Sequence, residues 1–393
     1  MSGALKRDEW ETVRLGDVCE VNPSKKFNVT ISDDLNVGFL PMEAVSNEGD
    51  ILRIDTRKYG EVKKGFSGFQ DGDVLIAKIT PCMENGKGAL VSGMPCGIGF
   101  GSTEFHVLRP NLSKCHAKYI FHILENPLLR QDFARKMTGS AGQKRLPKDA
   151  LQKLEILLPP LDIQRRIAET LDKVTELITL RKTQLEKLDE LVKARFVELF
   201  DVQKCRRKTL GECTDFVDYR GHTPELSDTG TIRMVNAKSV GKGFFKYVDE
   251  YVTEETYDSW MHRGFGYPGD ILFVTEGHTF GNTCLIPNDL KKFALGQRVI
   301  TIKGHEEVLN AFLCSYMQTD LFWKDINVYR TGGTAQGIRS KDLVKVYVPI
   351  PPLEQQKQFA SFVEQTDKSK VIIQQSLDAL ETLKKSLMQE YFG

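Results

Sequence analysis

The sequence contains no long apolar run. Its 393 residues include no stretch of about 18 or more apolar residues, which is the length that a membrane-spanning helix requires. The first residues, Met1 to Trp10, also lack the apolar segment of a secretory signal. We therefore expect a cytoplasmic protein with no membrane among its partners.

Metal-binding and disulfide patterns are missing as well. The chain has no C-x-x-C pair and no H-x-x-x-H spacing, which are spacings that zinc sites use. Scattered thiols fit a reducing compartment better than a disulfide framework. We expect no metal site, and free thiols at Cys19, Cys82, Cys96, Cys115, Cys205, Cys213, Cys284 and Cys314.

No catalytic motif is complete either. The chain lacks the Walker pattern G-x-x-x-x-G-K-[ST], whose backbone amides would hold phosphate. It also lacks the Asn-Pro-Pro-aromatic tetrad of amino-methyltransferases, to which Asn22-Pro23-Ser24-Lys25 is the nearest approach. Asp73 to Lys78 and Asp270 to Glu276 resemble a nuclease carboxylate cluster but do not supply its Glu-x-Lys. We expect a chain that catalyses nothing and binds no cofactor itself.

The excess of positive charge that is typical of DNA-binding domains is absent. The chain carries 54 Lys and Arg against 53 Asp and Glu, a net charge of +1. Any binding to nucleic acid must then come from local clusters such as Lys63-Lys64, Lys144-Arg145 and Arg206-Arg207-Lys208. Taken singly, each cluster is more typical of a solvated surface.

The sequence does contain an internal repeat. The segment from Leu151 to Leu161 and the segment from Leu343 to Leu353 both carry an apolar run that ends in Pro-Pro-Leu. A helical pattern follows each copy, since proline cannot continue a strand and presets the entry into a helix. We predict long helices over about 161–200 and 353–392.

Both predicted helices show the alternating three- and four-residue apolar spacing of a coiled coil. We call the row of residues at this spacing the seam of each helix. Polar residues interrupt the seam at Arg181 and Arg195 in the first helix, and at Thr366, Lys370 and Lys384 in the second. The seam residues are Ile167, Leu171, Val174, Ile178, Leu185, Leu188, Val192 and Leu199, and then Phe359, Val363, Ile373, Leu377, Leu380, Leu387 and Tyr391.

The repeat divides the chain into globular parts 1–158 and 201–350 and helical parts 159–200 and 351–393. The second helix can bury its seam only by lying back along the first, so we predict an antiparallel pair. The fold class is then α+β, with two similar modules of mixed strand and helix, a pseudo-two-fold relation and a near-circular course of the chain. The alternative is a helical hairpin inside one large domain.

The two globular parts also match each other at shorter landmarks. Leu15-Gly16-Asp17 corresponds to Leu210-Gly211-Glu212, and Phe100-Gly101-Ser102 to Leu295-Gly296-Gln297. The Gly-Asp pairs at Gly72-Asp73 and Gly269-Asp270 are typical of turns into buried strands. β-like stretches (Phe105 to Leu108, Val299 to Ile302) follow, and Gly-rich loops open at Thr138-Gly139 and Thr331-Gly332. Two modules that share these landmarks but differ in sequence between them indicate a duplicated recognition domain with two different targets.

In this order of parts, the sequence resembles the specificity subunit of a Type I restriction–modification enzyme. The matching motifs are Leu158 to Ala168 and Ile350 to Ala360, together with the Gly-Asp strands, Ser102-Thr103-Glu104-Phe105 and the Thr-Gly loops. The second helix departs from the family pattern at Gln355 to Phe359. The resemblance covers the whole chain.

The resemblance implies a non-catalytic subunit that reads double-stranded DNA. Each module would recognise one half of an interrupted target, and the two helices would fix the spacer and dock two methyltransferase subunits. Restriction and translocation subunits would join through these. S-adenosylmethionine, ATP and Mg²⁺ would be bound by the partner subunits, and this chain would bind no cofactor.

Base-reading side chains are expected on loops that the scaffold holds, where they can reach base edges and phosphates. In the first module we predict DNA contacts at Lys78, Thr80, Asn85, Lys87, Ser102, Thr103, Gln143, Lys144 and Arg145. In the second we predict them at Thr275, His278, Thr279, Asn282, Gln297, Arg298, Gln336 and Arg339. For Thr80 the alternative is a cap on the turn at Pro81, and for His278 an ordinary loop histidine.

Two other functions stay open at this point. A coiled-coil scaffold that joins two proteins and never touches DNA would fit the low net charge. The recognition subunit of a related two-component system, whose partner combines methylation and cleavage, would fit the sequence equally well.

Overall fold

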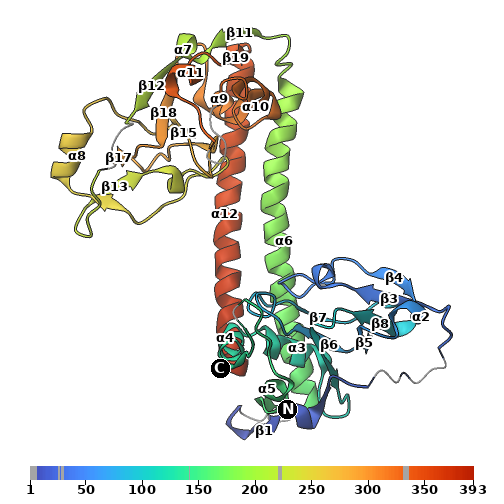
Figure 1. The fold of residues 1–393 in the computed structure, drawn as a ribbon. Coiled ribbons are helices and arrows are strands. Elements are labelled where there is room, and N and C mark those ends of the chain that lie inside the picture. The colour runs from blue at the N-terminus through green and yellow to red at the C-terminus, as the bar shows by residue number, and fades with distance from the viewer. Residues whose placement is uncertain (1–6, 25–26, 28–30, 141, 220–223, 331–335) are drawn as a thin grey trace. The chain divides into compact units, whose positions relative to one another are not determined.

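The computed structural model describes the chain except for residues 1–6, 25–26, 28–30, 141, 220–223 and 331–335. It divides into two compact units. The first joins Met1–Arg181 with Ser376–Gly393, and the second is Lys182–Gln375 (Figure 1). Among the described residues, no helix has the length and apolar content needed to cross a membrane.

The first unit contains two four-stranded sheets and a two-stranded ribbon. One sheet is antiparallel, in the order β2 (Cys19–Val21), β9 (Phe105–Pro110), β6 (Val74–Ala77) and β7 (Gly88–Leu90). The other has the order β4 (Asp55–Lys58), β3 (Asn36–Leu40), β8 (Ile98–Gly101) and β5 (Ser67–Gln70), with only β3 and β8 parallel. Strand β1 (Glu11–Arg14) pairs antiparallel with β10 (Glu155–Leu158). The helices are α1 (Leu15–Val18), α2 (Tyr59–Val62), α3 (Ala117–Glu125), α4 (Pro127–Lys136), α5 (Lys148–Gln152) and the start of α6 (Leu161–Leu199), with the 3₁₀ helices η1 (Arg7–Glu9), η2 (Met42–Ala44) and η3 (Pro95–Gly97).

The second unit repeats this topology. Its main sheet has the order β12 (Thr214–Asp218), β18 (Val299–Gly304), β15 (Ile271–Val274) and β16 (Thr283–Leu285). The smaller sheet has the order β14 (Tyr251–Val252), β13 (Ile232–Val235) and β17 (Phe293–Leu295), and the ribbon joins β11 (Arg206–Thr209) to β19 (Tyr347–Ile350). The helices are α7 (Leu210–Cys213), α8 (Glu254–Trp260), α9 (Asn310–Tyr316), α10 (Asp320–Ile326), α11 (Ser340–Leu343) and α12 (Leu353–Phe392), with the 3₁₀ helix η4 (Ala237–Ser239). The predicted duplication of an α+β module is therefore confirmed.

The central strand of each main sheet begins at the predicted Gly-Asp turn. Gly72 and Gly269 have φ of 90° and 84°, a region that glycine enters without steric cost. The buried aspartate that follows closes the turn by accepting a backbone N–H, from Gln70 at 2.8 Å in the first unit. Asp270 accepts the N–H of Tyr267 at 2.9 Å in the same way. The turns thus fix where β6 and β15 start and which side chains enter the core.

The two long helices carry the predicted seam. Every apolar seam position is buried or half-buried, and so are the polar residues that interrupt it. The interrupting residues have partners: Lys370 Nζ lies 2.6 Å from Asp189 Oδ1, and the Thr366 hydroxyl donates to the Phe362 carbonyl at 2.9 Å. Polar seam residues of this kind fix the register of a helix pair.

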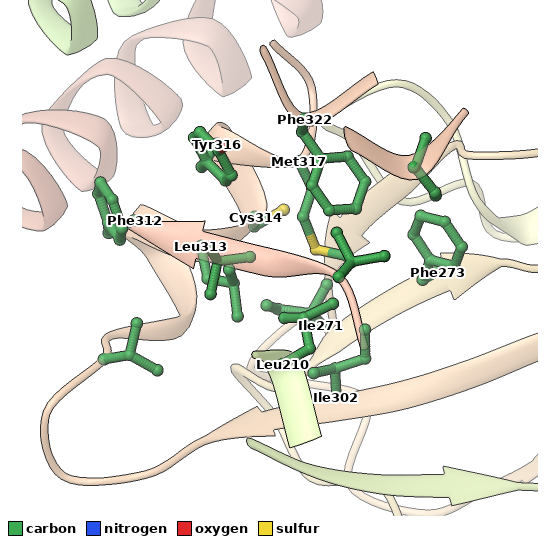
Figure 2. Close-up of a cluster of buried hydrophobic side chains, with 14 of the residues drawn as sticks. Leu210, Ile271, Phe273, Ile302, Phe312, Leu313, Cys314, Tyr316, Met317 and Phe322 are labelled. Atoms are coloured by element: carbon green, nitrogen blue, oxygen red, sulfur yellow. The ribbon is translucent and has the colours of Figure 1, made fainter. Parts of the chain in front are cut away.

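Within each unit, the start of one long helix shares a core with the end of the other (Figure 1). In the second unit, Phe196 near the end of α6 lies 5.5 Å from Phe359 near the start of α12, measured between ring centroids. The same core holds Phe312 of α9 and the residues that line the main sheet (Figure 2). In the first unit, Leu171 and Met388 belong to one buried cluster. The helices of each unit therefore run in opposite directions, as predicted.

Each long helix is also anchored to its module by one fully buried glutamine. The Gln164 side chain accepts the backbone N–H of His116, at the start of α3, at 2.8 Å, and donates to the Pro159 and Lys114 carbonyls at 2.7 and 3.1 Å. Gln356 accepts the N–H of Leu309, at the start of α9, at 2.8 Å, and donates to the carbonyls of Pro351 and Glu307. A buried amide with its hydrogen bonds satisfied holds the two elements in one geometry.

Candidate nucleic-acid interface

Three loop segments meet at the end of the central strand in the first unit. They are Lys78–Thr80, which follows β6, Ser102–Glu104, which precedes β9, and Gly142–Leu146. Backbone N–H groups of Lys78, Thr80 and Leu146 donate to carbonyls of Glu104, Lys144 and Lys78 respectively. We call this meeting point the junction. Seven of the nine residues predicted in this module lie in the junction, and only Asn85 and Lys87 lie outside it.

The second unit builds an equivalent junction from Thr275–Gly277, Gln297–Arg298 and Gln336–Ile338. The N–H groups of Thr275, Gly277 and Ile338 donate to the carbonyls of Arg298, Gln336 and Thr275. By these bonds, Thr275 takes the place of Lys78, and Arg298 takes the place of Glu104. Four of the eight residues predicted in this module, Thr275, Gln297, Arg298 and Gln336, meet here.

An ion pair crosses each junction, with its charges placed differently. In the first unit, Arg145 binds Glu104 with Nε and Nη2, at distances of 2.9 to 3.2 Å. In the second, Arg298 Nε lies 3.1 Å from Glu276 Oε1. Sequence reasoning missed both glutamates, because each partner lies more than twenty residues away and only the fold brings the pair together.

The electrostatics follow from these contacts. The hydrogen bonds from Arg145 hold the pKa of Glu104 below its usual value, and burial works against them. Below the first junction, His106 is buried with Nε2 at 2.8 Å from the Leu146 carbonyl, and burial lowers its pKa. His106 is therefore neutral near pH 7. Its hydrogen bond with Leu146 holds the segment Gly142–Leu146 in place without adding a charge.

Some predicted residues are occupied in holding loops together. The Lys87 ammonium donates to the Met42 carbonyl at 3.0 Å, and the Asn282 side-chain amide donates to the Val240 carbonyl at the same distance. Thr275 is only 2% exposed and its hydroxyl donates to the Arg298 carbonyl. The Thr80 hydroxyl accepts the N–H of Lys144 and donates to the Gly142 carbonyl. These residues hold the loops that carry exposed neighbours.

The remaining predicted residues differ in exposure. Asn85, Thr103, Gln143, Lys144 and Arg145 are exposed in the first unit, as are His278, Thr279, Arg298 and Arg339 in the second. Lys78, Ser102, Gln297 and Gln336 are half-buried. Asn85, His278 and Thr279 lie on the loop after the central strand, outside the junction, and Arg339 immediately precedes α11. The predicted loop at Thr331-Gly332 lies outside the described residues.

Within the described part of the chain, no three His, Cys, Asp or Glu side chains gather as a metal site would require. All eight cysteines are free. The two junctions instead offer backbone amides, hydroxyls, amides and guanidinium groups on loops, which are the groups that contact phosphates and base edges in protein–DNA complexes.

The repeated α+β module, each copy with a loop junction and an anchored long helix, defines a two-module protein. The sequence profile of the family described as "Type I restriction modification DNA specificity domain" matches residues 7–190 and again 208–382. The chain belongs to this family and contains two copies of its domain.

Curated relatives agree with the family. The chain is 38% identical over 199 residues to the Type I restriction enzyme EcoEI specificity subunit of Escherichia coli, a match that covers 49% of this chain and 33% of that protein. The EcoAI specificity subunit of the same organism is 37% identical over 211 residues, 53% of this chain and again 33% of the relative. The chain thus spans one third of the length of these two relatives. The putative MjaX specificity subunit of Methanocaldococcus jannaschii is 23% identical over 97% of this chain and 92% of its own.

Solved structures share the fold. The S subunit of a Type I restriction–modification system from M. genitalium superposes with a TM-score of 0.61 at 14% identity, over 100% of this chain and 97% of that one. A chain from a structure of the type I R-M system gives a TM-score of 0.56 at 20% identity, over 97% of both chains.

Proposed function

We propose that this chain is the non-catalytic DNA-recognition subunit of a Type I restriction–modification complex. Each module reads one half of an interrupted double-stranded target, and the long helices dock two methyltransferase subunits, through which restriction subunits join. The proposal is supported by one observation above others. The same three-segment junction occurs twice, on the same scaffold, with different side chains at equivalent places.

The difference between the junctions supports two different half-sites. Arg298 stands where the first module has Glu104, and Thr275 stands where it has Lys78. In the second module, Glu276 contacts Arg298 through Nε, so this ion pair does not use the two terminal nitrogens of the guanidinium. A guanidinium held in this way suits the O6 and N7 acceptors of guanine in the major groove.

Exposed apolar residues on the long helices support the docking of partner subunits. In the first unit, Leu177 and Leu180 of α6 are 44% and 52% exposed, although they lie beside the seam. In the second unit, Val371 and Ile372 of α12 are 56% and 68% exposed. Large apolar side chains that neighbour one another on a helix surface are typical of protein–protein contacts.

The chemistry of the complex belongs to its partners in this proposal. S-adenosylmethionine would be bound by the methyltransferase subunits, and ATP and Mg²⁺ by the restriction subunits. This chain would supply the position on DNA at which those reactions occur, and its cytoplasmic location would follow from that of the DNA.

The test is to map methylated adenine across the genome of cells that co-express this chain with the methyltransferase encoded beside it. We expect a new interrupted motif that is absent without this chain. A soluble complex with an active methyltransferase but no new motif would favour a scaffold that does not bind DNA. A partner that both methylates and cleaves in one polypeptide would instead favour the two-component system.

A further inference from the structure

A short turn of the second module, bonded to Asn282 and Thr283, has a composition that the first module lacks. Val240 and Phe245 form an isolated antiparallel bridge, and the turn Gly241–Phe244 lies between them. The Gly241 N–H donates to the Phe244 carbonyl at 2.9 Å, and Gly243 has a φ of 85°. We call Gly241–Phe244 the tip. It is a tight hairpin turn of the kind that glycine permits.

The tip is fastened to the loop that follows the central strand. The Gly243 N–H donates to the Thr283 carbonyl at 2.8 Å, and the Asn282 side chain donates to the Val240 carbonyl at 3.0 Å. A Cβ at Gly243 would also lie 2.9 Å from Gln318 Oε1, so the turn sits closely on the segment after α9. These contacts hold the tip beside the loop on which His278, Thr279 and Asn282 lie.

An exposed aromatic ring is held in place on the tip. Phe244 is 54% exposed, and its ring covers the Gly241 backbone so closely that a Cβ there would lie 2.7 Å from ring atoms. The ammonium of Lys246 lies 5.4 Å from the ring centroid. Lys242 and Lys246 are both exposed. Phe244 stands between these two lysines in the sequence, and an apolar edge with cations close by matches the surface of DNA, which offers apolar base edges between rows of phosphates.

The equivalent turn of the first module has the opposite charge. The bridge of Val45 with Ile51 matches that of Val240 with Phe245, and the turn between them carries Glu48 and Asp50. The Ser46 hydroxyl accepts the N–H groups of both acidic residues, at 3.1 and 3.0 Å. The same scaffold therefore presents an acidic turn in one module and a basic, aromatic turn in the other.

We propose that the tip is a DNA contact of the second module. Phe244 places its ring edge against a base, for which the C5-methyl group of thymine is the chemical match, and Lys242 binds a backbone phosphate. This inference rests on the proposed function. It adds to that function a specificity-determining aromatic residue outside the junction and confines its effect to the second half-site.

The direct test is photo-crosslinking in the complex with the methyltransferase. Phe244 is replaced by p-benzoylphenylalanine, and the complex is irradiated on a duplex that carries the motif found by methylation mapping. We expect a crosslink to the DNA strand within the second half-site. Phe265, which is 45% exposed in the same module but precedes β15, is the matched control and should give none.

Binding measurements provide the second test. Phe244→Ala should weaken binding to the target about tenfold, the size expected when the burial of one aromatic side chain is lost. The salt dependence of binding should stay the same. Lys242→Ala should instead lower the slope of log Kd against log salt by about one. Phe265→Ala, a control for folding, should change neither quantity.

The outcomes separate this inference from the proposed function. If the complex methylates its motif but residue 244 gives no crosslink, and Phe244→Ala keeps both affinity and motif, the tip inference is overturned and the proposed function stands. Relaxation of one position in the second half-site supports the inference. Relaxation in the first half-site contradicts it. Failure of the proposed function shows in the wild-type complex itself, as an absent motif.

Discussion

At the scale of single residues, each of the two junction arginines already forms an ion pair with a glutamate of its own module. Arg145 uses two of its nitrogens on Glu104, while Arg298 uses one on Glu276. The difference matters because a bidentate contact with guanine needs two free donors in the guanidinium plane. Arg298 is the better placed of the two to read a base.

Arg298→Ala should relax the motif at one position of the second half-site. The loss of a bidentate contact should reduce discrimination at that position by about 1–3 kcal/mol. Methylation mapping of the mutant complex measures it. Arg145→Ala is the matched control and should leave the second half-site unchanged. An unaltered methylation motif in the Arg298→Ala complex would show that Arg298 does not contact a base.

A second set of residues gives the first unit a pH-dependent link between α3 and α6. His122 is 3% exposed at its side chain, and its ring nitrogens lie 2.8 Å from Glu125 Oε2 and from Asp172 Oδ1. Lys118 and Lys384 also face these carboxylates. Burial lowers the pKa of His122, but the two carboxylates outweigh it, so the net shift is upward. Burial raises the pKa of Asp172, and His122 and Lys118 together lower it to about 2.

The directions of the two pKa shifts define a pH range in which the link stabilises the fold most. Because the folded pKa of His122 is raised, its contribution is complete below its ordinary value of 6.5 and is lost as the pH rises through the raised value. Because the pKa of Asp172 is lowered, its contribution is present above 3.8 and is lost as the pH falls toward 2. The link is therefore strongest between these two ordinary values, in mildly acidic solution.

We expect His122→Gln to lower the free energy of unfolding by about 1–3 kcal/mol at pH 6, and by less at pH 9. Urea unfolding at the two pH values measures it. Ser315, at the equivalent place on α9, donates to the Ala311 carbonyl and has no carboxylate partner there. Ser315→Ala is thus the control and should show no pH dependence. An equal loss at both pH values for His122→Gln would contradict the link.

At the scale of elements, the long helices were the most predictable part of the chain. The predicted helices over about 161–200 and 353–392 are α6, Leu161–Leu199, and α12, Leu353–Phe392. Seam spacing and Pro-Pro-Leu are local signals, so the sequence carries them directly. The polar interruptions at Lys370 and Lys384 could not be explained from sequence, because their partners Asp189 and Glu125 lie on other elements.

The loops were predictable only as regions. The Gly-Asp turn and the strand after it are local patterns, and they place Lys78 and Thr275 correctly at a strand end. The pairing of Glu104 with Arg145 depends on how three loops close, which no spacing records. The tip at Phe244 was not among the predicted residues, although Gly241 to Lys246 combines glycine, aromatic and basic residues. The base-contacting residues themselves stay a prediction.

The border between the two compact units falls between Arg181 and Lys182 on α6. An insertion of four residues, about one helical turn, between Thr179 and Lys182 would fall at this border. We expect it to alter the spacer of the methylated motif while both half-site sequences stay the same. Methylation mapping measures this, and Thr179→Ala, which keeps the length of the helix, is the control. A changed base sequence in either half-site would contradict the hypothesis that the helices set the spacer length.

At the scale of the whole molecule, each compact unit takes a helix from both halves of the sequence. Phe196 and Phe200 from the first half enter the core of the second unit, and Met388 from the second half enters the core of the first. Phe392 also packs edge-on against Tyr119 at 5.4 Å, and the Arg7 guanidinium donates to the Gly393 carbonyl. The first and last residues that the structure describes therefore meet in the first unit, which agrees with the predicted near-circular course. The pseudo-two-fold relation and the four segment boundaries stay predictions.

A chain cut after Asp201 should therefore work as two pieces. The aromatic side chains of α6 and α12 would stay exposed in separate halves, and their burial favours association by roughly 1.5–3 kcal/mol for each large side chain. We expect co-expressed halves to co-purify and to restore the motif. Phe196→Asp in the first half is the control, because a carboxylate in that core should prevent recovery. Halves that fold but stay apart would count against the closed architecture.

The glutamine anchors have a consequence for how such a protein can change. Gln164 and Gln356 make every one of their hydrogen bonds to main-chain atoms of the module and of the Pro-Pro turn. The anchor therefore places no demand on which side chains surround it, only on the path of the backbone. A module of quite different sequence can be attached to the same helix if it keeps that path. Recombination between genes could then exchange one module, and with it one target, for another in a single step. The hydrogen bonds of the glutamine would join the new module to the helix without further change.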